Sequence, residues 1–396
     1  MEFYKETNFK ETPIGKIPED WSVVKLTSIT NILKGFAFSS EFFNEKKEGV
    51  PLIRIRDLGR NETESYYSGP YDDLYIVNKG DILVSMDGEF NAYIWNGPPG
   101  LLNQRVCKFW SKNPSKLDNL FLYYEIQNPL KIIESQVSQT TVKHLLDRDI
   151  ERIKIPLPSL SEQKGIVEIL SVVDLAIQKT DEIIAKTERL KRGLMQTLLT
   201  KGIGHKEFKE TPIGKIPKDW EIIKLGSIVE FRNGKRPETI LRKGIPIYGA
   251  NGIMGYTDKF LIDEKFTVII ARVGMGTVGK VHLAKGKIWV SDNAIYTRCK
   301  LSEVYPPYLF YFLKFMHLGK LALRSAAGSY AIITQDSLKN LKLRLPPLIE
   351  QQRIAKILMN IDKKLELEIK EKTKLVKIKQ NLMDLLLTGK VRVKVN

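Results

Sequence analysis

The amino-acid sequence predicts an α+β protein in which two α/β domains are each followed by one long helix. Three observations predict this class: a motif that opens both halves, a helical pattern of about 40 residues that ends both halves, and short strand-like runs between them. A chain of 396 residues has room for two or three domains.

The two halves of the chain share a repeated frame. Residues 9–21 read FKETPIGKIPEDW and residues 208–220 read FKETPIGKIPKDW, with twelve of thirteen positions identical. LPSLSEQKGIVEILSVVD at 157–174 and LPPLIEQQRIAKILMNID at 345–362 form a second pair, and LMQTLLT and LMDLLLT close the halves at Thr200 and Thr388. The frame is therefore an internal duplication, whereas the regions between these motifs share little sequence.

Two long helices are predicted over residues 161–200 and 349–388, which contain no Pro and place apolar residues every three or four positions. A helix of 40 residues is about 60 Å long and needs a partner. The simplest partner is the other helix; the alternative is that each helix is buried in its own globular domain. The residues expected to pack are Ile166, Leu170, Val173, Ile177, Ile184 and Leu194 in the first helix and Ile354, Leu358, Ile361, Leu365 and Leu382 in the second.

The frame also sets the expected domain limits. We expect an α/β domain over residues 1–160, a helix over 161–202, a second α/β domain over 203–348, a second helix over 349–390 and a basic tail over 391–396. Strands are expected at 51–56, 81–85, 105–110, 267–273, 287–291 and 294–299, and shorter helices at 117–127 and 307–315.

Charge is distributed unevenly along the chain, whose 63 Lys and Arg and 46 Asp and Glu give a net charge of +17. Residues 1–160 carry a net charge of −2 and residues 201–348 one of +13. This excess favours a polyanionic partner; a lysine-rich surface without such a partner is the alternative. Two cysteines exclude a disulfide-stapled scaffold, and no run of 18 apolar residues or signal peptide is present, so we expect a cytoplasmic protein.

Motifs for chemistry in the chain itself are weak. Residues 274–279 match G-x-G-x-x-G, but the β-branched stretch that follows predicts a hairpin instead of the helix that a dinucleotide site requires. Val281 stands where a P-loop needs Ser or Thr. The four histidines have no metal-ligand spacing. We therefore predict no catalytic residue, no metal site and no cofactor on this chain.

The repeated frame resembles the specificity subunit of type I restriction–modification systems. The motifs TPIGKIP-x-DW and LP-x-L-x-EQ are similar to those of that family, as are GFAFS at 35–39, PLIRIRDL at 51–58, GDILVS at 80–85 and NQRV at 103–106. In the second domain IPIYGANGIMG at 245–255 and WVSDNAI at 289–295 are similar to a common type of its recognition domains. The resemblance covers nearly the whole chain.

The resemblance implies an α+β fold of two α/β target-recognition domains joined by two conserved helices, packed as an antiparallel coiled coil with pseudo-twofold symmetry. Each domain would read one half of a bipartite double-stranded DNA site, and the helices would set the gap. The frame would bind two methyltransferase subunits, with restriction subunits as an optional third component. S-adenosylmethionine, ATP and Mg²⁺ are expected on those partners. The alternative is a stand-alone dimeric-type DNA-binding or scaffold protein with coiled-coil helices, although the sequence lacks a basic region joined to heptads and a helix-turn-helix pattern.

DNA contacts are expected from side chains that recognise base edges or phosphates, which are Arg, Lys, Asn, Gln and hydroxyl groups. The candidates of the first domain are Lys34, Arg54, Arg56, Asn103, Gln104, Arg105, Thr140, Thr141 and Lys143. Those of the second are Lys235, Arg236, Tyr248, Asn251, Arg272, Asn293, Ser329 and Tyr330. For each of them the alternative is a solvated surface side chain or a local cap. The duplicated Trp21 and Trp220 are expected to serve packing or subunit docking instead.

Overall fold

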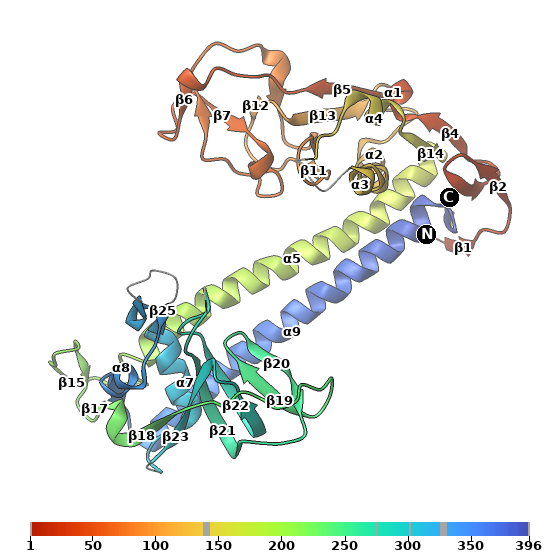
Figure 1. The fold of residues 1–396 in the computed structure, drawn as a ribbon. Helices are drawn as coiled ribbons and strands as arrows, with labels where there is room; N and C mark the ends of the chain where they lie inside the picture. Colours follow the sequence, from red (N-terminus) through yellow and green to blue (C-terminus); the bar gives the residue numbers. More distant parts are fainter. Residues whose placement is uncertain (1, 138–142, 275, 301, 325–330, 395–396) are drawn as a thin grey trace. The chain divides into compact units, whose positions relative to one another are not determined.

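The structure is a computed structural model that describes residues 2–137, 143–274, 276–300, 302–324 and 331–394. Its chain divides into a first unit, Met1–Lys179 with Lys372–Asn396, and a second unit, Thr180–Glu371. Figure 1 labels the two long helices, α5 (Leu160–Leu198) and α9 (Leu348–Leu387). Each of these helices contributes one segment to the first unit and one to the second. The expected domain limits near residues 160 and 348 fall where these helices begin, whereas the compact units divide inside the helices.

Two sheets form the first α/β domain. One has the strand order β11-β10-β13-β5 with antiparallel neighbours, and the other has the order β6-β8-β7-β12-β9 with β7 and β12 parallel. The strands are β5 (Thr30–Lys34), β6 (Phe43–Asn44), β7 (Val50–Ile53), β8 (Tyr66–Tyr67), β9 (Ile76–Val77), β10 (Ile82–Ser85), β11 (Ala92–Ile94), β12 (Gly100–Leu102) and β13 (Val106–Ser111). Helices α2 (Asn119–Glu125) and α3 (Gln127–Gln136) share a core with β10, β13 and both long helices.

One six-stranded sheet forms most of the second domain, in the order β18-β23-β21-β22-β19-β20. Its strands are β18 (Val229–Asn233), β19 (Ile245–Gly249), β20 (Gly252–Thr257), β21 (Ile262–Ala271), β22 (Val281–Val290) and β23 (Ala294–Cys299). β19 and β22 run parallel, and β21 and β22 form a long antiparallel hairpin. The apolar helix α7 (Pro306–Phe315) packs on this hairpin and completes a core that also contains residues of both long helices.

The repeated frame forms the same elements in both units. A hairpin opens each half, β2 (Phe9–Thr12) with β3 (Gly15–Pro18) and β15 (Phe208–Lys209) with β16 (Ile216–Pro217). A strand pair follows, β4 (Ser22–Lys25) with β14 (Lys154–Leu157) and β17 (Glu221–Lys224) with β26 (Lys342–Leu345). The other short elements are β1 (Glu2–Lys5) paired with β27 (Val391–Lys394), β24 (Leu323–Arg324) paired with β25 (Ala331–Ile332), α1 (Leu26–Ile29), α4 (Asp147–Glu151), α6 (Leu225–Ile228) and α8 (Gln335–Lys339).

One buried tryptophan of each frame binds the start of a long helix. Trp21 Nε1 donates a hydrogen bond to Glu162 Oε2 at 3.1 Å, and Trp220 Nε1 donates one to Glu350 Oε2 at 2.9 Å. Both indoles are almost fully buried. The two tryptophans therefore serve the packing of the frame in equivalent ways.

Reciprocal ion pairs join the long helices. In the first unit, Asp174 Oδ1 on α5 lies 2.6 Å from Lys379 Nζ on α9. In the second unit, Lys191 on α5 pairs with Asp362 on α9. The two aspartates are equivalent in the repeat, as are the two lysines, so the helices exchange roles. This exchange is the signature of an antiparallel pair with pseudo-twofold symmetry.

A tyrosine of each domain anchors that domain to the helix pair. Tyr124 Oη on α2 donates to Asp174 Oδ2 at 2.8 Å, and Tyr311 Oη on α7 donates to Asp362 Oδ2 at 2.7 Å. Tyr124 and Tyr311 are thus equivalent residues, although the sequences around them differ.

The apolar residues expected to pack on the long helices are all buried or half-buried. In the first unit, Ile166, Leu170 and Leu382 belong to the core that contains β10, β13 and α2. In the second unit, Leu194, Ile354 and Leu358 belong to the core beneath α7. Each helix end therefore packs on a domain and on the other helix at once, which combines the two alternatives that the sequence left open.

Some local structure differs from the sequence-based expectation. The strand expected at 51–56 ends at Ile53, because a 3-10 turn follows in which the Asp57 carboxylate accepts from the Arg54 N–H. The helix expected at 117–127 begins at Asn119, because Asp118 caps it. The hairpin expected in the stretch after Gly279 is wrong, because Val281–Val290 forms the single strand β22, which continues through Gly286 and pairs antiparallel with β21.

Candidate nucleic-acid interface

The candidate contacts of the first domain gather at one edge of its sheets. Parallel β7 and β12 both end at this edge. β5 and β10 also end there, because both are antiparallel to β13, which begins there at Val106. The Phe36 N–H donates to the Leu102 carbonyl at 3.0 Å, and the Gln104 N–H donates to the Phe36 carbonyl at 2.9 Å, which joins the edges of the two sheets. Lys34, Arg54 and residues 103–105 therefore lie on neighbouring loops.

Most basic side chains at this edge are ion-paired within the domain. Lys34 pairs with Asp147, and Arg105 Nε lies 3.5 Å from Asp87 Oδ2. His144 Nδ1 lies 2.7 Å from the other Asp87 oxygen. A phosphate that approaches this edge must therefore compete with the carboxylates.

No sequence pattern predicted that Asp87, His144 and Asp147 lie beside the candidate residues at this edge. Asp147 is 113 residues from Lys34 along the chain, and no local pattern signals that pairing. Lys143 is nearby, because its carbonyl accepts from the Gly88 N–H, but its Nζ lies 3.5 Å from Glu134 Oε1.

Three candidates are less available than the sequence suggested. Asn103 is only 6% exposed, and its Oδ1 is buried without a hydrogen-bond partner among the described residues. Arg54 is half-buried and donates to Ser65 Oγ. Arg56 Nη2 donates to the same oxygen at 3.0 Å, although its side chain is exposed.

The remaining candidates of the first domain are Gln104, Thr140 and Thr141. Gln104 is exposed. Thr140 and Thr141 lie outside the described residues.

The second domain gathers its candidates through backbone hydrogen bonds between loops. The Lys235 N–H donates to the Val290 carbonyl at 2.8 Å, and the Ser291 N–H donates to the Tyr248 carbonyl at 2.9 Å. The Arg272 N–H donates to the Asn293 carbonyl at 3.0 Å. These bonds bring Lys235, Tyr248, Arg272 and Asn293 to the ends of neighbouring strands.

The candidate basic side chains of this second edge differ from those of the first edge in their ion pairing. Lys235 and Arg236 are exposed and Arg272 is half-exposed, and none of them is ion-paired to another residue in the parts of the chain that the structure describes. Asn251 is exposed and accepts from Lys280 Nζ at 3.1 Å. Ser329 and Tyr330 lie outside the described residues. The second edge thus presents basic side chains without ion pairs among the described residues, whereas carboxylates of the first domain partly neutralise the basic side chains of the first edge.

A glycine has the same place at both edges. Gly35 follows β5, and Gly234 follows β18 at the equivalent position of the frame. A Cβ atom on Gly35 would lie 1.9 Å from the Asn103 carbonyl oxygen, and one on Gly234 would lie 2.1 Å from the Ser291 carbonyl oxygen. Only glycine permits this close approach of two backbones. Each edge is therefore built around the same backbone contact.

Both cysteines of the chain are free thiols. Burial raises the pKa of the Cys107 thiol to about 12 and that of Cys299 to about 11, so both stay protonated and unreactive at neutral pH. No group of three or more His, Cys, Asp or Glu side chains that could hold a metal ion occurs within the described part of the chain. Among those residues there is also no helix both long and apolar enough to cross a bilayer.

Comparison with known proteins identifies the family. Residues 18–189 and 217–377 match the family described as type I restriction modification DNA specificity domain. Two relatives from Methanocaldococcus jannaschii align with the whole chain: the type I restriction enzyme MjaVIII specificity subunit is 32% identical over 98% of its own length, and the putative type I restriction enzyme MjaX specificity subunit is 33% identical over 99%.

A solved structure shows the same fold. The type I restriction–modification S subunit from M. genitalium superimposes with a TM-score of 0.66 at 19% identity, over 93% of this chain and 96% of that one. With the family match and the full-length relatives, this likeness accounts for both domains and both helices. The chain belongs to the family of type I restriction–modification DNA specificity subunits.

Proposed function

We propose that this protein selects the DNA sequence for a type I restriction–modification enzyme, with each α/β domain reading one half of a bipartite site. The observation that supports this most strongly is the equivalence of the two edges. Each edge collects polar and basic side chains at strand ends, around glycines that occupy the same position of the frame. Because the frame is duplicated and the edges differ in side chains, the two half-sites should differ in sequence.

The remaining parts of the chain would organise the complex. The two helices set the distance between the half-sites, and the repeated frame binds two methyltransferase subunits, to which restriction subunits are added in the complete enzyme. S-adenosylmethionine, ATP and Mg²⁺ bind those partners, and this chain carries no catalytic group. The whole complex acts in the cytoplasm.

The direct test is to map methylated sites in DNA after co-expression with the methyltransferase. We expect a bipartite site, and we expect Asn251→Ala at the second edge to relax one half of it while the other half stays unchanged. The loss of a base contact should cost about 1–3 kcal/mol of discrimination. DNA binding without any effect on methylation would favour a stand-alone DNA-binding protein instead.

Salt dependence should differ between the edges. Substituting Lys235 and Arg236 together by Gln should reduce the slope of log affinity against log salt concentration by about 2, because each phosphate contact contributes about 0.9. Lys34→Gln should change the slope less, since Asp147 already neutralises Lys34. Fluorescence anisotropy at several salt concentrations measures both slopes; an equal change per removed cation would contradict the charge assignment.

The edge glycines should be essential to binding. Gly234→Ala should lower DNA affinity about tenfold or more, because a methyl group 2.1 Å from a carbonyl oxygen must push the two loops apart. Gly193→Ala on α5 is the matched control, since an added Cβ there has no atom within 4 Å and alanine favours a helix. Equal affinities of the two variants would show that the contact does not shape the interface.

A further inference from the structure

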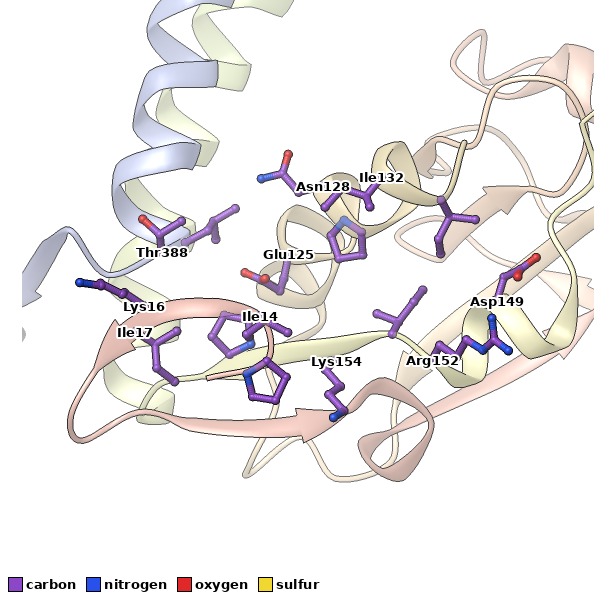
Figure 2. Close-up of a pocket in the computed structure, with 16 residues that line it drawn as sticks. Ile14, Lys16, Ile17, Glu125, Asn128, Ile132, Asp149, Arg152, Lys154 and Thr388 are labelled. Atoms are coloured by element: carbon purple, nitrogen blue, oxygen red, sulfur yellow. The ribbon is translucent and has the colours of Figure 1, made fainter. Parts of the chain in front are cut away.

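An apolar pocket in the first unit contains a buried carboxyl group that the proposed DNA edge does not use. The pocket has a volume of about 460 Å³ and is lined by the β2–β3 turn, α3, β14 and the end of α9 (Figure 2). Ile14, Ile132 and Pro156 belong to its walls. Glu125 also lines it, is 7% exposed, and its Oε2 has no hydrogen-bond partner among the described residues. A buried polar atom without a partner is costly, so it calls for an explanation.

Comparison of the two units indicates which type of side chain fits the pocket. In the first unit Pro156 pairs with Val23, and in the second unit Arg344 takes the equivalent place opposite Ile222. Arg344 Nη2 donates to the Ile213 carbonyl at 2.6 Å. Ile213 is the duplicate of Ile14 in the opening motif. The second unit therefore places a guanidinium at its own turn, which is the duplicate of the turn that borders the pocket in the first unit.

The position of Glu125 shows the reverse difference between the two units. Tyr124 and Tyr311 are equivalent through their aspartate bonds, so Glu125 corresponds to Phe312, which is 1% exposed. The first unit has the carboxyl group and lacks the arginine; the second unit has the arginine and lacks the carboxyl group. The Glu125 side chain and the Ile14 carbonyl are thus two acceptors to which no guanidinium is bonded among the described residues of the first unit.

We propose that this pocket receives an arginine side chain of a methyltransferase subunit, whose guanidinium binds the Glu125 carboxylate and the Ile14 carbonyl. An apolar-walled pocket with two acceptors suits arginine, which has a long apolar stem and five donors on a planar head. The repeated frame contributes part of the walls, at Ile14, Ile17 and Leu387. The partner is assigned from the proposed function, in which the frame binds the methyltransferase, so this inference depends on it.

The charged groups around the pocket leave Glu125 unpaired. Lys16, Asp149, Arg152 and Lys154 also line it, yet none of them forms an ion pair with Glu125 in the described part of the chain. Burial raises the pKa of Glu125 well above its ordinary value of 4.5. The folded chain therefore keeps this proton at pH values where the unfolded chain has lost it, and stability falls as pH rises above about 4.5.

Two variants of the full chain test the proposal. Glu125→Leu should raise the unfolding temperature of the free chain at pH 7.5, with a smaller gain near pH 4, and should weaken methyltransferase binding about tenfold or more. Pro156→Arg supplies the missing guanidinium from within and should stabilise the chain relative to Pro156→Met, while blocking the partner's arginine. In a Glu125→Leu background, Pro156→Arg should give no such gain.

The outcomes separate this inference from the proposed function. Titration of the purified methyltransferase against each variant gives the dissociation constants. Wild-type affinity of Glu125→Leu, with a bipartite site still mapped, would overturn the pocket and leave the proposed function intact. A loss of stability in Arg152→Met equal to that expected for breaking a Glu125 pair would show that Arg152 occupies the pocket, which also overturns the proposal. Failure of the wild-type chain to bind any methyltransferase would overturn both.

Discussion

Replacement of Arg392 by methionine is expected to destabilise the first unit by about 3–5 kcal/mol, because it leaves a buried carboxylate without its cation. The Arg392 and Glu162 side chains are each 7% exposed. Arg392 Nε donates to Glu162 Oε1 at 2.5 Å and Nη2 donates to Oε2 at 2.8 Å. The same guanidinium donates to Glu6 at 2.6 Å and to Asp20 at 2.8 Å.

These bonds join three distant segments of the chain. Arg392 lies on β27, Glu162 lies in the first turn of α5, and Glu6 and Asp20 belong to the N-terminal segment. Glu162 also accepts from Trp21 Nε1, so the loss of Arg392 leaves that carboxylate with one weaker donor. The second unit uses His205 at the matching place, where Nε2 lies 2.9 Å from Glu350 Oε1.

Chemical denaturation of the full chain measures the effect, and Lys394→Met is the matched control. Lys394 is on the same strand and pairs with Glu2 at 3.3 Å, but both side chains are more than 60% exposed. Such a surface pair contributes about 0–1 kcal/mol. Equal losses in the two variants would show that burial does not strengthen the Arg392 cluster. Adding Glu162→Gln to the Arg392 variant should recover part of the loss, because it removes the unpaired charge.

The cluster should also make the first unit sensitive to acid. The hydrogen bonds from Arg392 lower the pKa of Asp20 below its ordinary value. The contribution of this carboxylate is then present above the pKa of the unfolded chain and is lost as pH falls through the lower pKa of the folded state. The difference in stability between wild type and Arg392→Met should therefore shrink below about pH 4.

Insertion of four residues into both long helices is expected to lengthen the gap between the half-sites by one or two base pairs. Four residues add about 6 Å of helix, and a base pair rises about 3.4 Å. Four residues also make slightly more than one turn, so the apolar stripes stay nearly in phase. The half-sites themselves should not change, because no residue moves within its own domain.

The ion pairs dictate where the insertions belong. An insertion between Thr187 and Leu190 of α5 falls between Asp174 and Lys191, which bind α9 through Lys379 and Asp362. Lengthening α5 alone would put one of these pairs out of register. The matched insertion in α9 must therefore lie between residues 362 and 379.

Sequencing of methylated sites measures the gap. A two-residue insertion at the same points is the control, since it turns the stripes by about half a turn and should cost stability. Retained activity with an unchanged gap in the four-residue variant would leave the helices as a docking platform without a spacing role.

The sequence by itself determined the features that depend on local pattern. The duplicated motifs predicted the frame, and apolar residues every three or four positions predicted α5 and α9 nearly to their ends. The β-branched stretch after Gly279 predicted extended structure in place of the helix that a dinucleotide site requires, and it forms strand β22. These predictions succeed because helix and strand formation depend on residues within a few positions of one another.

Tertiary structure alone decided which side chains meet. The sequence proposed Asn103 and Lys34 as DNA contacts, but only the packed strands bury Asn103 and bring Asp147 to Lys34. It gave no reason to relate Glu125 to Arg344, because the correspondence of Glu125 with Phe312 rests on tyrosine–aspartate hydrogen bonds in each unit, and Arg344 binds a turn 131 positions away. Charge balance and burial at a site depend on residues that strand register and helix packing bring together, such as Lys34 and Asp147 at a separation of 113 positions, so no local pattern contains them.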